Sequence, residues 1–284
     1  MKKGLITCGA VLAGGYLYSI MPSLRTHSDM EKLKTYRYAH RGLHDNASDA
    51  PENSLRAFAK AADAGYGIEL DVQLSKDDIP VIMHDFVLGR IARDEYGNAP
   101  EGKVRDYTFE ELQKFFLLDS DQRIPSFAQV LELVNGRVPL IVEYKTEEKE
   151  MTVCEKGNEL LKDYKGLYCV ESFNPRAVNW YRIHRPDIIR GQLSDAYTQD
   201  PNYQGALYAA LEYLMLNWKT KPDFIAFNRK HEENLSRKLC RKLFHNTAVG
   251  WTIKDEDQLI EAKQLYDIVI FDSFVPKQGP RVSL

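Results

Sequence analysis

The sequence predicts an α/β protein folded as a (β/α)8 TIM-type barrel, and three observations lead to this. Short β-rich runs alternate with amphipathic helical stretches from about residue 36 onward, which is typical of parallel strands joined by helices. There are eight such units in about 245 residues, the size of a (β/α)8 barrel. No G-x-G-x-x-G motif follows the first run, which disfavours the runner-up, an open doubly wound sheet.

An apolar segment opens the chain. The 18 residues from Gly4 to Met21 carry no charge, which is long enough for a helix to cross a hydrocarbon core. We interpret residues 1–24 as an N-terminal membrane-anchor or signal-like helix and residues 25–35 as a linker. A cleaved signal peptide and a surface-bound helix are the alternatives, and basic residues on both sides leave the orientation open. The segment therefore predicts membrane association through a single helix, with secretion as the alternative.

The barrel domain is expected over residues 36–278. A helical face in residues 52–65 follows the first strand, with Phe58 and Ala62 on one side and Gly65 suited to end the helix. The eight predicted strands are RYAHRG (37–42), GIELDV (67–72), PLIVEYK (139–145), LYCVESF (167–173), IIRGQLS (188–194), DFIAFN (223–228), AVGWTI (248–253) and IVIFDS (268–273).

One further run, PVIMHD (80–85), does not fit the parallel series. Only about six residues separate it from the second strand, whereas a parallel crossover needs a dozen or more. We therefore expect an extra antiparallel leg, joined to the second strand as a β-hairpin. A turn centred on residues 76–78 would place Asp71 roughly opposite His84.

Polar side chains gather at the predicted C-terminal ends of the strands. Residues two apart on a strand share a face, so Glu69 and Asp71 point one way and their apolar neighbours point the other. Glu143 and Lys145 repeat this arrangement, and His40 ends the first strand. Enzymes with this barrel build their active sites at that rim.

These residue types suit phosphoryl transfer. Carboxylates alone favour a hard cation, Mg²⁺ or Ca²⁺, and a cation also reduces the cost of burying them. Arg41 and Lys145 add positive charge for an anionic group such as phosphate. His40 and His84 supply an acid–base pair that titrates near neutrality.

Short motifs in this order resemble those of the glycerophosphodiester phosphodiesterase family. They are HRG (40–42), PENS (51–54), ELD (69–71), HD (84–85), EYK (143–145), SF (172–173) and WT (251–252). The resemblance covers about residues 36–275. The motifs are specific as a set, although each alone is weak.

The resemblance implies metal-dependent hydrolysis of glycerophosphodiesters, such as glycerophosphocholine or glycerophosphoethanolamine, to glycerol 3-phosphate and an alcohol. It leaves open whether water or a substrate hydroxyl attacks. By motif position the implied roles are an acid–base pair of His40 and His84, one Mg²⁺ or Ca²⁺ on Glu69, Asp71 and Glu143, phosphate binding by Arg41 and Lys145, and a candidate substrate pocket at Phe173 and Trp251.

Two other functions are compatible with these residues. One is a phospholipase D-type hydrolase of lysophospholipids or sphingolipids, and the other is a non-catalytic anchored binding protein. The family's WTVN appears here as WTIK (251–254), and its Thr-Asp-Pro ending appears as FDSFVP (271–276). Both departures lie at the rim and leave the head group open.

Other polar residues have plainer interpretations. Glu52 and Asn53 fit loop bonding and a helix cap as well as catalysis. The histidines at positions 44, 184, 231 and 245 suggest surface or structural roles. With 38 basic and 41 acidic side chains, the net charge of −3 gives no reason to expect a nucleic-acid partner. The four cysteines show no C-x-x-C spacing, so a disulfide framework is not expected. The oligomeric state is left open.

Overall fold

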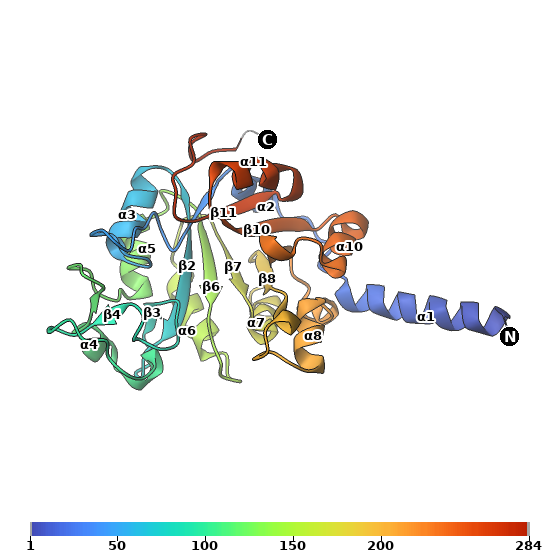
Figure 1. Cartoon of the computed structure of the whole chain (residues 1–284), viewed down its shortest axis with the longest axis horizontal. Coiled ribbons are helices and arrows are strands. Elements are labelled where there is room, and N and C mark those ends of the chain that lie inside the picture. Colours follow the sequence, from blue (N-terminus) through green and yellow to red (C-terminus); the bar gives the residue numbers. More distant parts are fainter. Residues whose placement is uncertain (1, 283–284) are drawn as a thin grey trace.

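Eight parallel strands form a closed barrel in the computed structural model, which describes the backbone of residues 2–282 and the side chains of residues 11–282 (Figure 1). The strands follow one another around the barrel in chain order, and pairing of the first strand with both the second and the last closes it. All eight predicted runs are confirmed. The barrel strands are β1 (Tyr38–His40), β2 (Gly67–Leu74), β6 (Leu140–Tyr144), β7 (Tyr168–Ser172), β8 (Arg190–Ser194), β9 (Phe224–Asn228), β10 (Thr247–Ile253) and β11 (Ile268–Phe271).

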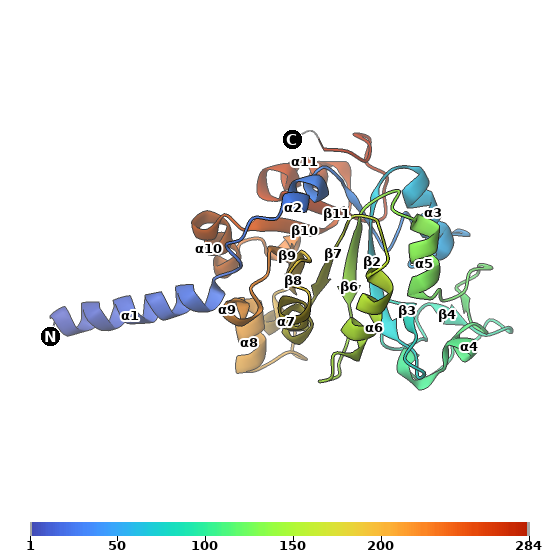
Figure 2. The ribbon, with the colours of Figure 1, turned by 180° about the vertical axis from the view of Figure 1, so that it is seen from behind.

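Helices surround the barrel on the outside (Figure 2). Ser54 caps the first of them by accepting a hydrogen bond from the Ala57 amide at 3.1 Å, and Gly65 follows the end of that helix with a φ of +80°. The helices after the strands are α3 (Leu55–Asp63), α5 (Phe127–Val134), α6 (Thr152–Leu161), α7 (Pro175–His184), η2 (Tyr197–Gln199), α8 (Ala206–Glu212), α9 (Asn217–Thr220), η3 (Arg229–His231), α10 (Leu235–Phe244) and α11 (Glu256–Leu265).

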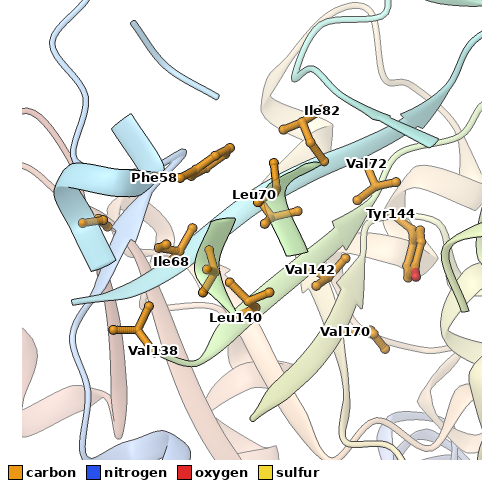
Figure 3. Close-up of a cluster of buried hydrophobic side chains, with 14 of the residues drawn as sticks. Phe58, Ile68, Leu70, Val72, Ile82, Val138, Leu140, Val142, Tyr144 and Val170 are labelled. Carbon is orange, nitrogen blue, oxygen red and sulfur yellow. The ribbon is translucent and has the colours of Figure 1, made fainter. Parts of the chain in front are cut away.

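The second strand shows the alternation on which the site depends. Ile68, Leu70 and Val72 point outward into an apolar layer between β2, β6 and the helices (Figure 3). Their alternates, Glu69 and Asp71, consequently point to the barrel interior, as predicted. Burying such an apolar set is worth about 1.5–3 kcal/mol per side chain, so a one-residue slip of β2 is strongly disfavoured.

The extra leg is an antiparallel strand, β3 (Pro80–Ile82), and it confirms the predicted hairpin. Val72 pairs with Ile82, and the Met83 amide donates to the Asp71 carbonyl at 3.0 Å. Met83 therefore lies opposite Asp71, and His84 comes one residue later than the approximate pairing we expected. The reason is that the hairpin is symmetric about Asp77, the middle of the predicted turn.

A short excursion between β3 and α5 packs around its own apolar cluster, which includes Leu88, Ile91 and Leu112. This excursion lies beside the barrel mouth and carries Arg90 toward it. Its elements are β4 (Ala92–Arg93), η1 (Val104–Asp106), α4 (Phe109–Leu112) and β5 (Phe116–Leu117).

The N-terminal part holds two helices. α1 (Lys2–Ile20) projects away from the barrel (Figures 1 and 2), and its C-terminal end is held: Ile20 is buried, and its carbonyl accepts from Asn217 Nδ2 at 3.0 Å. α2 (Ser28–Lys34) lies in the segment predicted as a linker and packs Met30 and Leu33 against the barrel interior. Among the described residues, no helix is long and apolar enough to cross a membrane.

Candidate active site

Three carboxylates from two neighbouring strands meet inside the barrel. Register pairs Asp71 with Glu143, and Glu69 lies two residues earlier on β2. Each side chain offers an oxygen within 4.8 Å of the other two, and all three are buried. This group comprises the residues that we assigned to metal binding from the sequence.

The protonation of these carboxylates reflects their crowding. Burial, followed by the neighbouring Asp71 and Glu143 carboxylates, raises the pKa of Glu69 well above its ordinary value. Burial also raises the pKa of Glu143, although Lys145 opposes the shift. Burial alone would raise the pKa of Asp71, but Lys145, His84 and Arg41 hold it low. A cation among these oxygens would relieve the repulsion, so the donor set fits Mg²⁺ or Ca²⁺.

The two predicted phosphate-binding residues contact the same carboxylates. Lys145 Nζ lies 2.8 Å from Glu143 Oε1 and 3.3 Å from Asp71 Oδ1. Arg41 Nε lies 3.4 Å from Asp71 Oδ2, and the Arg41 amide donates to Glu69 Oε2 at 3.1 Å. Both side chains therefore lie at the cluster and balance part of its negative charge.

Two histidines flank the cluster, and each is held by an aspartate. His40 Nδ1 lies 3.1 Å from Asp272 Oδ2, while its Nε2 faces Glu69 Oε2 at 3.9 Å. His84 Nδ1 lies 2.5 Å from Asp85 Oδ1, which leaves Nε2 as the free ring nitrogen. Burial lowers the pKa of His40 to about 4 against the opposing hydrogen bond with Asp272, so this imidazole is neutral at pH 7.

The loop after β1 supports the site through ionic and hydrogen bonds. Glu52 accepts from Arg41 at 2.6 Å and from Arg90 at 2.6 and 2.9 Å. Asn53 is not the helix cap, since Ser54 takes that role; its Nδ2 instead donates to Asp71 Oδ2 at 2.8 Å. Glu52 therefore holds the Arg41 side chain in place, and Asn53 holds the Asp71 carboxylate.

A cavity of about 330 Å³ opens at these residues. Phe173 and Trp251, the predicted substrate pocket, meet edge to face at one wall with ring centroids 5.6 Å apart. Trp251 Nε1 is buried and has no hydrogen-bond partner among residues 2–282. The lining residues are His40, Arg41, Glu69, His84, Glu143, Glu171, Phe173, Leu193, Trp251, Thr252, Lys254, Ile270 and Asp272.

Several residues at the mouth were missed by the sequence reasoning. Asp272 contacts His40 and Lys254. It also contacts His44, whose Nε2 lies 3.1 Å away. The surface or structural role suggested for His44 did not anticipate a position at the barrel mouth. Glu171 is buried beside Glu143, to which it is paired in register. The alternation applied to β2 and β6 would have found Glu171, whereas only tertiary contact reveals His44.

Comparisons with known proteins agree with this geometry. Residues 40–259 match the profile described as the Glycerophosphoryl diester phosphodiesterase family. A glycerophosphodiester phosphodiesterase of Caldanaerobacter subterraneus subsp. tengcongensis is 37% identical over 185 residues, covering 60% of this chain and 70% of the relative. Human glycerophosphodiester phosphodiesterase 1 is 30% identical over 164 residues, covering 53% of this chain and 46% of the relative.

Solved structures show the same fold. The glycerophosphodiester phosphodiesterase of Thermotoga maritima superposes with a TM-score of 0.61 at 25% identity, covering 84% of this chain and 94% of the other. An Oleispira antarctica phosphodiesterase in complex with the product sn-glycerol-3-phosphate superposes with a TM-score of 0.65 at 24% identity, covering 83% and 92%.

Proposed function

The chain belongs to the glycerophosphoryl diester phosphodiesterase family and is a phosphoric diester hydrolase, and from this premise we propose that it cleaves small glycerophosphodiesters with the help of a divalent cation. The products are glycerol 3-phosphate and an alcohol such as choline or ethanolamine. The product complex of the Oleispira antarctica phosphodiesterase supports glycerol 3-phosphate as one of them. The observation that carries the proposal is the convergence of three buried carboxylates and two histidines on one cavity.

The two histidines divide the proton transfers between them. His40 is neutral at pH 7, so its Nε2 is the base that takes a proton from the attacking oxygen. A new bond forms from that oxygen to phosphorus as the bond from phosphorus to the alcohol oxygen breaks. His84 donates its proton to the departing alcohol from Nε2, since Asp85 engages Nδ1.

The carboxylates Glu69, Asp71 and Glu143 would hold the cation. When bound, Mg²⁺ or Ca²⁺ supplies positive charge for the phosphate oxygens and for the charge that develops on them. Arg41 borders the cavity and orients the same phosphate through its guanidinium. Lys145, already placed against Glu143 and Asp71, adds a second positive charge for the phosphate.

The aromatic side chains that line the cavity favour the alcohol part of the substrate. Phe173 and Trp251 offer aromatic faces, which suit the cationic head group of choline. The unpartnered Trp251 Nε1 is a donor for a substrate oxygen. The phospholipase D-type alternative differs in the presence of a long acyl chain and stays a prediction.

Membrane association through α1 is a separate part of the proposal. Val11 and Leu12 are 69% and 71% exposed on the projecting helix. Tyr18 stacks on Trp218 at the base of the helix with centroids 6.1 Å apart. Exposed aliphatic side chains above an aromatic base suit a helix that contacts a lipid surface.

Hydrolysis of glycerophosphocholine tests the proposal. We expect glycerol 3-phosphate and choline in equal amounts, loss of turnover with EDTA, and recovery on addition of Mg²⁺ or Ca²⁺. His40→Ala and His84→Ala should each abolish turnover while circular dichroism stays unchanged. Full activity in either variant, or in EDTA, would contradict the assigned roles.

A further inference from the structure

A second group of metal-ligating side chains lies at the barrel mouth beside the carboxylates. His40, His44 and Asp272 each offer one ligand atom within 4.8 Å of the other two. They come from the end of β1, the loop after it and the end of β11, so closure of the barrel brings them together. None of the three belongs to the Glu69, Asp71 and Glu143 group.

These ligand atoms lie close enough together to share one metal ion. His40 Nδ1 lies 3.1 Å from Asp272 Oδ2, and His44 Nε2 lies 3.1 Å from Asp272 Oδ1. Zinc bonds of about 2.0–2.1 Å in a tetrahedron put neighbouring ligand atoms about 3.3 Å apart. Small side-chain shifts therefore suffice for one ion to contact all three residues, and the open cavity leaves a position for water.

His44 gives an independent sign of a missing ligand. Its side chain is only 11% exposed, its Nδ1 has no hydrogen-bond partner among the described residues, and its Nε2 lies 3.1 Å from Asp272 Oδ1 outside good hydrogen-bond geometry. A buried imidazole without such a partner is costly, since each unsatisfied group loses its hydration. Bonding to a cation would satisfy the nitrogen that faces Asp272.

We propose that His40, His44 and Asp272 bind Zn²⁺ and that the bound ion inhibits the hydrolase. Two imidazole nitrogens and one carboxylate are a donor set for zinc, whereas the all-oxygen cluster prefers Mg²⁺ or Ca²⁺. The two sites thus select different ions by ligand chemistry. Binding through Nδ1 requires the single ring proton of the neutral His40 to move from Nδ1 to Nε2 by exchange with solvent.

Inhibition follows from the use of His40, and this part rests on the proposed function. An ion on Nδ1 replaces the hydrogen bond to Asp272 and puts positive charge on the ring. The Nε2 atom then carries the ring proton and cannot accept a proton from the attacking oxygen. Lys254 Nζ, which contacts Asp272 and is half-exposed, competes with zinc for this carboxylate.

Zinc binding can be measured without turnover, on the full chain in excess Mg²⁺. We expect one zinc site by calorimetry, and Co²⁺ as a probe should give the visible absorption of a tetrahedral site. His44→Gln should weaken zinc binding at least about tenfold, since even outer residues of metal sites cost that much. The matched control His231→Gln should bind like the wild type, and Lys254→Met should bind zinc more tightly.

Two further measurements separate this proposal from the assigned catalytic roles. His84→Ala should bind zinc with wild-type affinity whether or not it turns over, because His84 is outside the site. In the active wild type, zinc should inhibit with a midpoint equal to its dissociation constant, and His44→Gln should resist inhibition at least about tenfold better. Absence of zinc binding in excess Mg²⁺, equal binding by His44→Gln, or binding without inhibition would each overturn the proposal.

Discussion

His40 Nδ1 lies 3.1 Å from Asp272 Oδ2, so the first and last strands of the barrel hold one imidazole between them. The contact fixes which ring nitrogen carries the proton and directs Nε2 toward Glu69. Burial alone would raise the pKa of Asp272, but the contacts with His40, His44 and Lys254 keep it well below its usual range. Asp272 is therefore an ionised partner that orients the ring.

Substitution of Asp272 tests this positioning role. Asp272→Asn keeps the shape but can present an amide donor to Nδ1, which selects the wrong tautomer. We expect kcat to fall by about 100-fold or more, with KM changed much less. Ser273→Ala is the matched control, because it removes a different hydrogen bond to Asp272, of 2.9 Å, and leaves His40 untouched. An equal loss in both variants, or a loss confined to KM, would contradict the role.

Cation binding should stabilise the fold as well as support turnover. The pKa values of Glu69 and Glu143 are raised by burial and mutual repulsion, so a cation that binds the native state offsets this unfavourable term. Saturating Mg²⁺ or Ca²⁺ should raise Tm by about 5 °C or more relative to EDTA. In Glu143→Gln the increase should shrink to a small fraction, as measured by calorimetry. An exposed substitution, Glu132→Gln, should keep the full increase.

The barrel could be predicted because period-two alternation marks its strands directly. All eight runs became strands, and the alternation in β2 correctly placed Glu69 and Asp71 inside. The hairpin was predictable too, because a short connection excludes a parallel crossover. Its register differs by one residue from the expected one, because Met83 and not His84 lies opposite Asp71.

Residues joined only by barrel closure could not be predicted in the same way. His44 lies in an irregular loop and meets Asp272 from the far end of the chain, a contact that no local pattern indicates. Arg90 reaches Glu52 from the excursion in the same manner. Glu171 is different: its strand alternates like β6, so its inward position was available from the sequence and was overlooked.

Glu52 should make stability depend on pH. Burial alone would raise its pKa, but Arg90, Arg41 and Asn46 lower it to about 2 from 4.5. A carboxylate with a lowered pKa contributes stability above pH 4.5, and this contribution is lost as the pH falls toward 2. The shift corresponds to about 3 kcal/mol at neutral pH. The difference in unfolding free energy between the wild type and Glu52→Gln should be near this value at pH 7.

Denaturant unfolding across pH checks this prediction. The difference for Glu52→Gln should stay constant from pH 7 to about 5 and then shrink steadily below pH 4.5. Glu132→Gln, at an exposed helix position, serves as the control and should show a small, pH-independent difference. A difference for Glu52→Gln that persists unchanged at pH 3 would show that its ion pairs do not control acid stability.

Membrane contact through α1 should depend on its exposed aliphatic side chains. Burial of a valine and a leucine in lipid is worth about 1.5–3 kcal/mol each, so Val11→Asp with Leu12→Asp should weaken vesicle binding at least about tenfold. Co-sedimentation with phospholipid vesicles measures this. The control Val87→Asp changes a valine that is 52% exposed on the excursion, on the other side of the barrel, and should bind as the wild type. Equal binding by all three proteins would exclude α1 as the contact.

The size of the cavity predicts a preference for water-soluble substrates. Its volume of about 330 Å³ is at the lower end for small-molecule sites, so an acyl chain must stay outside the walls formed by Phe173 and Trp251. An acyl chain outside the cavity makes no contact that helps the reaction at the phosphate. We therefore expect kcat/KM for glycerophosphocholine to exceed that for lysophosphatidylcholine at least about tenfold. Phosphorus NMR distinguishes glycerol 3-phosphate from lysophosphatidic acid as the product. Trp251→Ala should raise KM for glycerophosphocholine, because it removes an aromatic face and the free Nε1 donor. Turnover of the long-chain lipid alone would instead establish the phospholipase D-type reaction.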